Sequence, residues 1–271
     1  MVTFVFVVTG YVLAPGPAHA LDLVYLFVVY SVLGWGGANA FNSAEDRDEG
    51  PVNLLPDPPP RPRYLGAFGL GCGALAIVVA SAWPGMARTV APIVLSGALS
   101  IAYSWRSAPF RRFKEIGILD NVTNALGCGP LALTIGWGAR APYEATLAVY
   151  GVGFFAALFG GYTTTQIFQL DPSDTYATAR NYTSLVGPAR ALRLGALAFV
   201  VHAVVLASVV RWGGIVTAPF AAWLVLVAIA AVHSARWSQA PFTSPHRRML
   251  RQLAMMMGSQ VCFVAGAALT R

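Results

Sequence analysis

The chain has 271 residues, of which 56% are hydrophobic and only 11% are charged, and its mean hydropathy is +0.61. Soluble domains carry about 25% charged residues. This composition excludes an ordinary soluble domain and predicts an all-α integral membrane protein, folded as a single domain over residues 1–271. The three cysteines lie in apolar segments without paired spacing, so we interpret them as packing residues rather than metal ligands or disulfides. No nucleic-acid partner is expected.

Apolar stretches of roughly 20 residues are long enough to cross a bilayer. The first stretch is the weakest, because Pro15 and Pro17 interrupt it and Ala18-His19-Ala20 resembles a signal-peptide cleavage site. It lacks a basic leading region, so we expect a retained, short or tilted helix. The sequence predicts about nine membrane-spanning helices, over residues 2–18, 21–41, 64–83, 89–105, 117–138, 145–169, 188–210, 214–235 and 249–269.

The charges indicate the orientation of the bundle. With nine spans, 14 of the 18 basic residues and nine of the 11 acidic residues fall on the side that holds the N-terminus. The positive-inside rule makes that side cytoplasmic and puts the C-terminus on the far side of an inner or cell membrane. Because orientation does not require the acids, their presence on the same side predicts a polar site capping the cytoplasmic end.

The first candidate site lies where the second apolar stretch ends, at Asn42, Asp46, Asp48 and Glu49. On a helix, residues 42 and 46 share a face. Amide and carboxylate oxygens are the ligands that Mg²⁺ prefers. The proline-rich stretch that follows favours a stiff, extended loop, which could cap a cavity and place Arg61 or Arg63 over an anion. The alternative is a solvated linker whose charges only set topology.

The second candidate segment joins two apolar stretches. Arg112 and Lys114 are candidate diphosphate ligands, because fixed cations match phosphate oxygens. Asp120, Asn121 and Asn124 then enter an apolar helix, where polar groups are costly and usually functional. The alternative is a basic loop followed by asparagines that hydrogen-bond between helices.

The third candidate segment ends the sixth stretch, where Asp171 and Asp174 follow Gln166 and Gln169 and precede Arg180. We expect the two aspartates to face Asn42 and Asp46 across a cavity, so that metal ions held from both sides share one diphosphate, with the two carboxylate sets within very roughly 10 Å. The alternative is a helix end and turn, since Asp-Pro-Ser-Asp is suitable turn chemistry.

Together these motifs resemble the UbiA superfamily of intramembrane prenyltransferases. The similarity rests on Asn42-Ser-x-x-Asp46-Arg-Asp-Glu-Gly-Pro, on Tyr103-Ser104…Pro109…Arg112-x-Lys114…Asp120 and on Gln169-x-Asp171-x-x-Asp174, in the family's order and between the corresponding helices. It covers nearly the whole chain.

The resemblance implies a helical bundle with a central cavity open to lipid. Mg²⁺ would bridge the two acidic motifs to the diphosphate of an isoprenyl substrate, and a lipophilic aromatic or polyprenyl acceptor would capture the allylic cation. We expect Mg²⁺ as the cofactor, and an isoprenyl diphosphate, such an acceptor and membrane lipid as partners. The substrate-binding residues expected in the cavity are Tyr103, Asp120, Asn121, Asn124, Tyr162, Gln166 and Gln169.

Two departures from the family pattern leave alternatives open. Gly50 replaces the last carboxylate of the first motif, with Asp48 and Glu49 as possible substitutes, and Gln169 replaces the first aspartate of the second. A terpene cyclase of the same superfamily, which needs no acceptor, is therefore an alternative. Its cavity aromatics would steer the cation; Trp35, Tyr103, Phe154, Phe155 and Tyr162 are candidates, although each could be ordinary packing. A non-catalytic lipid carrier or transporter is a second alternative.

Overall fold

A computed structural model describes residues 3–47, 59–106, 111–170, 181–210 and 217–270. In these ranges the regular structure is entirely helical. The elements are α1 (Phe4–Leu13), α2 (Ala20–Leu26), η1 (Phe27–Trp35), α3 (Gly36–Asp46), α4 (Leu65–Ala82), α5 (Ala87–Ser104), η2 (Phe113–Glu115), α6 (Gly117–Leu126), η3 (Gly127–Leu131), α7 (Ala132–Gly138), α8 (Ala145–Gln169), α9 (Tyr182–Val186), α10 (Pro188–Ala207), α11 (Thr217–Trp237) and α12 (Pro245–Leu269).

Two long helices are each divided by a π-helical turn. The elements α2, η1 and α3 form one continuous helix from Ala20 to Asp46, and α6, η3 and α7 form another from Gly117 to Gly138. Pro130 lies in the second π turn and has no N–H to donate to the preceding turn, which favours local widening there. Counted this way, the described ranges hold a helix for each of the nine predicted spans, and six are long and apolar enough to cross a membrane. The chain is an integral membrane protein.

The first two helices refine the sequence prediction. The first is short, as expected, and ends at Leu13 before the two prolines. The second continues beyond its predicted end near residue 41, as far as Asp46, because hydropathy falls at the polar residues while the backbone stays helical. Asn42 and Asp46 are therefore on the helix itself, at its last turns.

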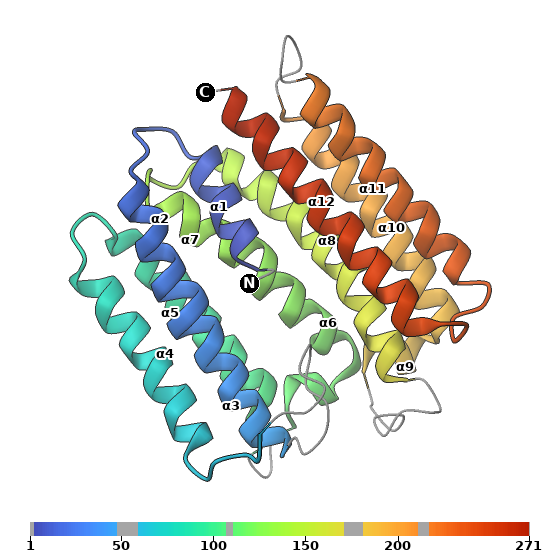
Figure 1. Ribbon diagram of the computed structural model, residues 1–271, viewed down its shortest axis with the longest axis horizontal. Coiled ribbons are helices and arrows are strands. Elements are labelled where there is room, and N and C mark those ends of the chain that lie inside the picture. The colour runs from blue at the N-terminus through green and yellow to red at the C-terminus, as the bar shows by residue number, and fades with distance from the viewer. Residues whose placement is uncertain (1–2, 48–58, 107–110, 171–180, 211–216, 271) are drawn as a thin grey trace.

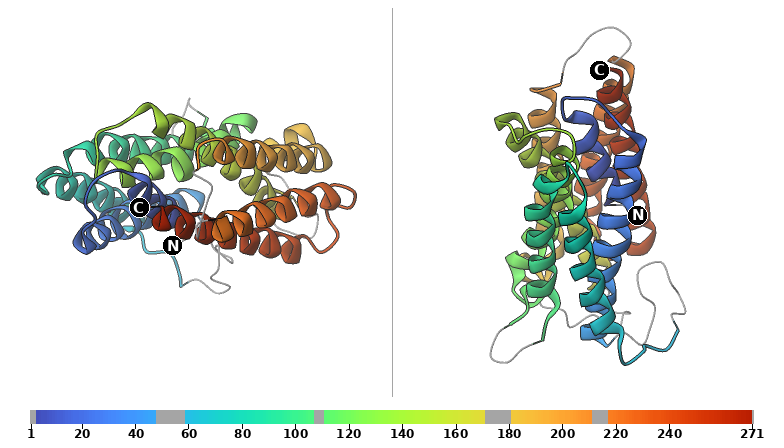
Figure 2. Two further views of the ribbon diagram at one scale, coloured as in Figure 1. Left: turned by 90° about the horizontal axis from the view of Figure 1, so that it is seen from above. Right: turned by 90° about the vertical axis from the view of Figure 1, so that its left-hand side faces the viewer.

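The helices run roughly along a common direction (Figures 1 and 2). Helices α2 to α5 lie at one side of the bundle and α8 to α12 at the other, with α1, α6 and α7 between them (Figure 1). The two sides are joined by contacts of α1 with α7 and α12, of α5 with α7, and of α6 with α8. The η2 turn contacts both α5 and α6 and therefore lies between the two sides.

Glycines allow the closest helix contacts. A Cβ atom on Gly37 of α3 would collide with the carbonyl of Gly69 on α4, and a Cβ atom on Gly69 with the carbonyl of Gly37. Small residues in membrane bundles let backbones approach in this way, because lipid provides no hydrophobic drive between helices. This contact fixes the helix that carries Asn42 and Asp46 against α4.

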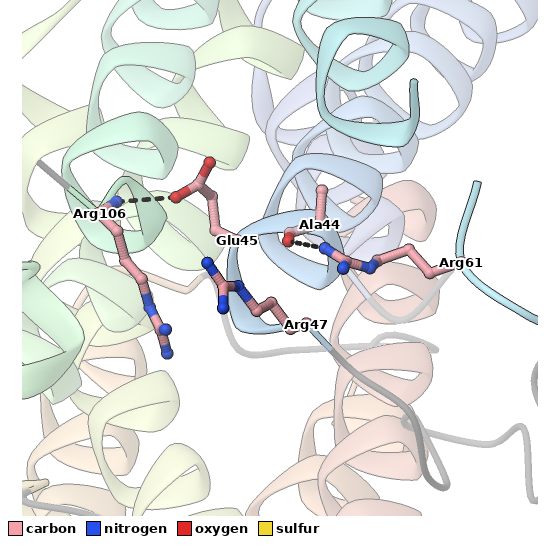
Figure 3. A pocket seen from close by; sticks show the side chains of 5 residues that line it. All are labelled: Ala44, Glu45, Arg47, Arg61 and Arg106. Carbon is pink, nitrogen blue, oxygen red and sulfur yellow. Dashed lines mark hydrogen bonds between the residues drawn. The ribbon is translucent and has the colours of Figure 1, made fainter. Parts of the chain in front are cut away.

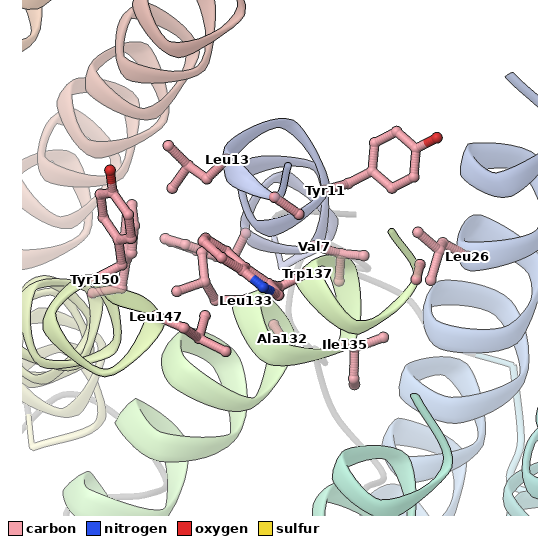
Figure 4. Packing of buried hydrophobic residues seen from close by; sticks show 14 of the residues in the cluster. Val7, Tyr11, Leu13, Leu26, Ala132, Leu133, Ile135, Trp137, Leu147 and Tyr150 are labelled. Atoms are coloured by element: carbon pink, nitrogen blue, oxygen red, sulfur yellow. The ribbon is translucent and has the colours of Figure 1, made fainter. Parts of the chain in front are cut away.

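The apolar core lies away from the polar end. Helices α1 and α7 pack together, with Val7, Leu133 and Trp137 at their contact, whereas the Tyr11 side chain points away from α7 (Figure 4). An aromatic cluster around Phe154, with ring contacts to Phe6, His202 and Phe263, joins α8 to α1, α10 and α12. Phe154 is fully buried in this core, so of the two interpretations of this aromatic, ordinary packing is the one that holds.

Candidate active site

Asp46, at the end of α3, is held by two cations from the α5–α6 connection. Arg112 donates from Nη1 to its Oδ1 at 2.7 Å, and Lys114 donates to its Oδ2. The side chains of Asp46, Arg112 and Lys114 are only 17%, 7% and 20% exposed. Arg112 and Lys114 follow Asp46 by 66 and 68 positions in the sequence, yet the three residues form one partly buried charge cluster.

Asn42 lies one turn earlier on the same helix, as the spacing predicts. Its Oδ1 accepts a hydrogen bond from the Ser104 hydroxyl at 2.9 Å, so α5 contacts the same face of α3. An amide oxygen has two lone pairs and retains acceptor capacity after one such bond. The two predicted ligands of α3 thus lie on one face, each with a partner from the neighbouring segment.

Arg112 remains charged despite its burial. Burial by itself lowers the pKa of its guanidinium, but hydrogen bonds to the carboxylates of Glu115 and Asp46 outweigh this effect and raise the pKa above its ordinary value. Glu115 accepts from Nε at 2.8 Å and from Nη2 at 2.5 Å. This pairing directs the remaining Nη1 towards Asp46.

Asp120 is the centre of a second polar cluster, on α6. It is 3% exposed. Its Oδ1 accepts a hydrogen bond from the Tyr103 hydroxyl at 3.0 Å, and its Oδ2 accepts one from Nε2 of Gln166 at 2.5 Å. The Tyr103 hydroxyl also lies 2.7 Å from that of Tyr162. Four predicted cavity residues from α5, α6 and α8 are thereby brought together.

The two clusters are contiguous through Lys114. Its ammonium lies 5.9 Å from the centre of the Tyr103 ring, the same ring whose hydroxyl binds Asp120. On the other side, Oε1 of Gln166 accepts from the Thr183 hydroxyl at 2.7 Å, which ties α8 to α9. A connected polar path therefore runs from α3 to α9, across both sides of the bundle.

The two asparagines of α6 behave differently. Asn121 donates from Nδ2 to the Phe159 carbonyl and to the Thr163 hydroxyl of α8. These are hydrogen bonds between helices, as expected if the asparagines of α6 serve helix packing. Its buried Oδ1 has no hydrogen-bond partner among the described residues. Asn124 donates to the Asp120 carbonyl one turn back. Asn121 thus keeps one buried acceptor available.

Arg61 is placed in a different group. It lines a hollow of about 580 Å³ with Ala44, Glu45, Arg47 and Arg106, and donates from Nη1 to the Ala44 carbonyl at 2.5 Å (Figure 3). Glu45 there accepts from the Arg106 backbone N–H at 2.9 Å. Asp46, Arg112 and Lys114 do not line this hollow. The structure therefore separates Arg61 from the two other predicted diphosphate ligands that it describes.

Several predicted residues lie outside the described ranges: Asp48, Glu49, Asp171, Asp174 and Arg180. Gln169 ends α8, as predicted. Within the part of the chain that the structure describes, no group of three histidine, cysteine or acidic side chains could hold a metal ion. The predicted convergence of the two acidic motifs stays a prediction.

Sequence reasoning missed three residues that complete these clusters. Glu115 carried a local signal, because it follows Arg112 by three positions, the usual spacing of an ion pair on a helical turn. Ser104 belongs to the motif that begins at Tyr103, but its partner Asn42 could not be predicted, because helix packing brings the two together. Thr183 carried no signal, since Gln166 reaches it in the same way.

This geometry defines the class of protein. It is a helical membrane bundle with a partly buried cluster of paired charges, Asp46 with Arg112 and Lys114, at one end, and a polar network around Asp120 next to it. The chain belongs to the UbiA prenyltransferase family, which it matches over residues 3–257. Comparison with curated proteins gives no match.

Three solved structures share the fold at low sequence identity. A UbiA homolog from Archaeoglobus fulgidus bound to DMAPP and Mg²⁺ is 16% identical, with a TM-score of 0.68 over 100% of this chain and 96% of that one. The apo UbiA homolog from Aeropyrum pernix K1 is 15% identical, with a TM-score of 0.70 over 99% and 96%. A digeranylgeranylglyceryl phosphate synthase is 13% identical, with a TM-score of 0.69 over 98% and 93%.

Proposed function

We propose that this protein is a Mg²⁺-dependent intramembrane prenyltransferase, which ionises an isoprenyl diphosphate and transfers the prenyl group to a lipophilic acceptor. The observation that carries the proposal is the cluster of Asp46, Arg112 and Lys114. The cluster combines a carboxylate, which can bind a metal ion, with a guanidinium and an ammonium group, which can bind an anion, at one end of the membrane bundle. Membership of the UbiA prenyltransferase family supports the same activity, and the A. fulgidus relative, bound to DMAPP and Mg²⁺, supports both the substrate class and the metal.

The described donors fit a hard divalent cation. Asn42 and Asp46 offer an amide and a carboxylate oxygen from one face of α3, and oxygen is the ligand atom that Mg²⁺ prefers. We propose that they hold the ion together with Asp171, Asp174 and one or both of Asp48 and Glu49. When bound, Mg²⁺ supplies Lewis-acid neutralisation of the leaving diphosphate.

Arg112 and Lys114 have a second role in this proposal. In the structure they neutralise Asp46. When the substrate enters, these cations exchange the carboxylate for phosphate oxygens, to which guanidinium and ammonium groups donate strong, charge-assisted hydrogen bonds. The exchange keeps both cations paired in each state, and it releases Asp46 for the metal. Arg180 is a further proposed diphosphate ligand.

The network around Asp120 forms the proposed wall of the prenyl site. The oxygens of the Asp120 carboxyl group carry negative partial charge, and the rings of Tyr103 and Tyr162 present electron-rich faces, so both features lower the energy of a nearby carbocation. Gln166 orients the carboxylate by donating to it, and the free Oδ1 of Asn121 is an additional acceptor in this wall. Asn124 and Gln169 complete the proposed substrate-binding set.

Terpene cyclisation is the second candidate, and Gln169 favours it. An amide at the first position of the second acidic motif removes one negative charge from the predicted wall. In a cyclase the allylic cation reacts with double bonds of the same prenyl chain, so the cavity needs no site for an acceptor.

Product analysis tests the proposal. The purified protein in lipid nanodiscs is given dimethylallyl, geranyl, farnesyl or geranylgeranyl diphosphate with Mg²⁺, with and without an extract of membrane quinone and lipid acceptors. A transferase releases diphosphate rapidly only with the acceptor extract and yields a prenylated lipid. Rapid release without an acceptor, with a cyclic hydrocarbon or alcohol as product, assigns the cyclase. No release with any substrate contradicts both.

A further inference from the structure

We propose that the arginine hollow beside α3 is a binding site for the phosphodiester headgroup of an anionic lipid, separate from the diphosphate site. The hollow is lined by Ala44, Glu45, Arg47, Arg61 and Arg106. Its lining residues include three arginines and one glutamate, which leaves two positive charges in excess among them. Guanidinium groups match phosphate oxygens in shape and charge, so the ligand class is a phosphate-bearing anion.

The arginines come from three separate parts of the chain. Arg47 directly follows α3, Arg61 precedes α4, and Arg106 follows α5. Figure 3 shows Arg61 and Arg106 approaching the end of α3 from opposite sides, with Arg47 between them. Arg61 is anchored by its hydrogen bond to the Ala44 carbonyl, at the end of a helix where carbonyl groups lack helical partners.

Two of these guanidinium groups have no partner in the part of the chain that the structure describes. Those of Arg47 and Arg106 form no ion pair or hydrogen bond with any residue in the described ranges, and both side chains are exposed. Glu45 uses Oε2 for the Arg106 backbone and does not pair with a guanidinium group there. The cations of the first cluster, Arg112 and Lys114, are by contrast committed to carboxylates.

The backbone of Arg47 is strained in a way that serves this placement. It adopts the left-handed conformation, with φ of 57° and ψ of 44°, at the position after α3 where glycine is usual. The conformation ends α3, and the Arg47 side chain lies at the hollow (Figure 3).

The neighbouring aromatics identify a lipid as the source of the phosphate. Trp105 immediately precedes Arg106 and is 55% exposed, and Tyr64, at the start of α4, is 69% exposed. Exposed tryptophan and tyrosine at the ends of membrane helices mark the headgroup level. The cytoplasmic leaflet is anionic and attracts basic residues at this depth. The hollow therefore lies where a lipid phosphodiester can enter it from the membrane.

Binding of short-chain lipids in detergent tests this site. We expect dioctanoyl phosphatidylglycerol to bind the wild-type protein more tightly than dioctanoyl phosphatidylcholine does, by native mass spectrometry or calorimetry. The double variant Arg47→Gln/Arg106→Gln should weaken phosphatidylglycerol binding about tenfold or more, since two charge-assisted hydrogen-bonding groups are lost. Arg63→Gln is the matched control, because it removes one exposed arginine of the same loop that does not line the hollow.

Two further arms separate the alternatives. Asp46→Asn should leave phosphatidylglycerol affinity unchanged, so that this site and the proposed catalytic site are tested independently. Equal phosphatidylglycerol binding by the wild type and the double variant overturns the proposal. So does inorganic phosphate or diphosphate binding that the double variant loses while phosphatidylglycerol does not bind, because the hollow would then be a site for a soluble anion. Unchanged thermal stability of the double variant confirms that it is folded.

Discussion

Replacing Asp46 by asparagine should separate binding of the diphosphate from its ionisation. In the structure each oxygen of Asp46 accepts from one cation, Arg112 or Lys114. Asparagine keeps the size of the side chain but removes its charge, so these two cations lose the competitor for phosphate. Without metal, inorganic diphosphate should therefore bind Asp46→Asn more tightly than the wild type.

The magnitude follows from the contacts. A hydrogen bond between charged groups contributes about 1.5–3 kcal/mol, and the partial exposure of Asp46 and Lys114 reduces this figure. Release of both cations by the substitution should favour diphosphate by about 1–2 kcal/mol, which is roughly a fivefold to thirtyfold change in the dissociation constant. With Mg²⁺ and a prenyl diphosphate, the same variant should lose about 10²-fold or more in turnover, the usual effect of removing one group that stabilises a developing anion.

Calorimetric titration of inorganic diphosphate in EDTA measures the first effect, and release of diphosphate from a prenyl substrate at saturating Mg²⁺ measures the second. Asp22→Asn is the control, because Asp22 lies at the other end of the same continuous helix, where it accepts from Tyr11. An unchanged or weaker affinity in EDTA would show that Asp46 does not compete for these cations. If the Asp46→Asn variant turned over at the wild-type rate, Asp46 would not be a metal ligand.

The remaining predictions concern the metal, the cations, the network and the helix contact. Excess EDTA should abolish turnover and excess Mg²⁺ restore it, because the proposed ligands are hard oxygens; full turnover in EDTA contradicts the metal. Lys114→Met should raise KM for the prenyl diphosphate about tenfold with a smaller effect on kcat, and an unchanged KM in steady-state kinetics would leave Lys114 a topology charge. Asp120→Asn should lower kcat about tenfold or more with little change in diphosphate affinity, whereas equal kcat would make Asp120 structural. Gly69→Leu should lower the thermal unfolding temperature by several degrees, since its side chain would meet the α3 backbone at Gly37 and Phe41; Gly71→Leu, with open space around its Cβ, should not.

The sequence by itself determined the class of the fold and the local geometry of the first motif. Long apolar stretches can satisfy their backbone hydrogen bonds in lipid only as helices or closed barrels, so the number and order of the helices followed from hydropathy. The spacing of Asn42 and Asp46 fixed them to one face, because the helical repeat is a local property. The motif from Tyr103 to Asp120 is likewise a local pattern, so it marks this segment as part of the site without indicating its partners.

Only the tertiary structure decided which charges meet. Arg61, Arg112 and Lys114 carry the same type of charge and were predicted to serve the same ligand, yet packing places two of them on Asp46 and the third in a separate hollow. Hydropathy and spacing describe one helix at a time, whereas these pairings depend on how α3, α4 and α5 cross. The close approach at Gly37 and Gly69 sets one of these crossings, and a glycine does not reveal its partner in the sequence.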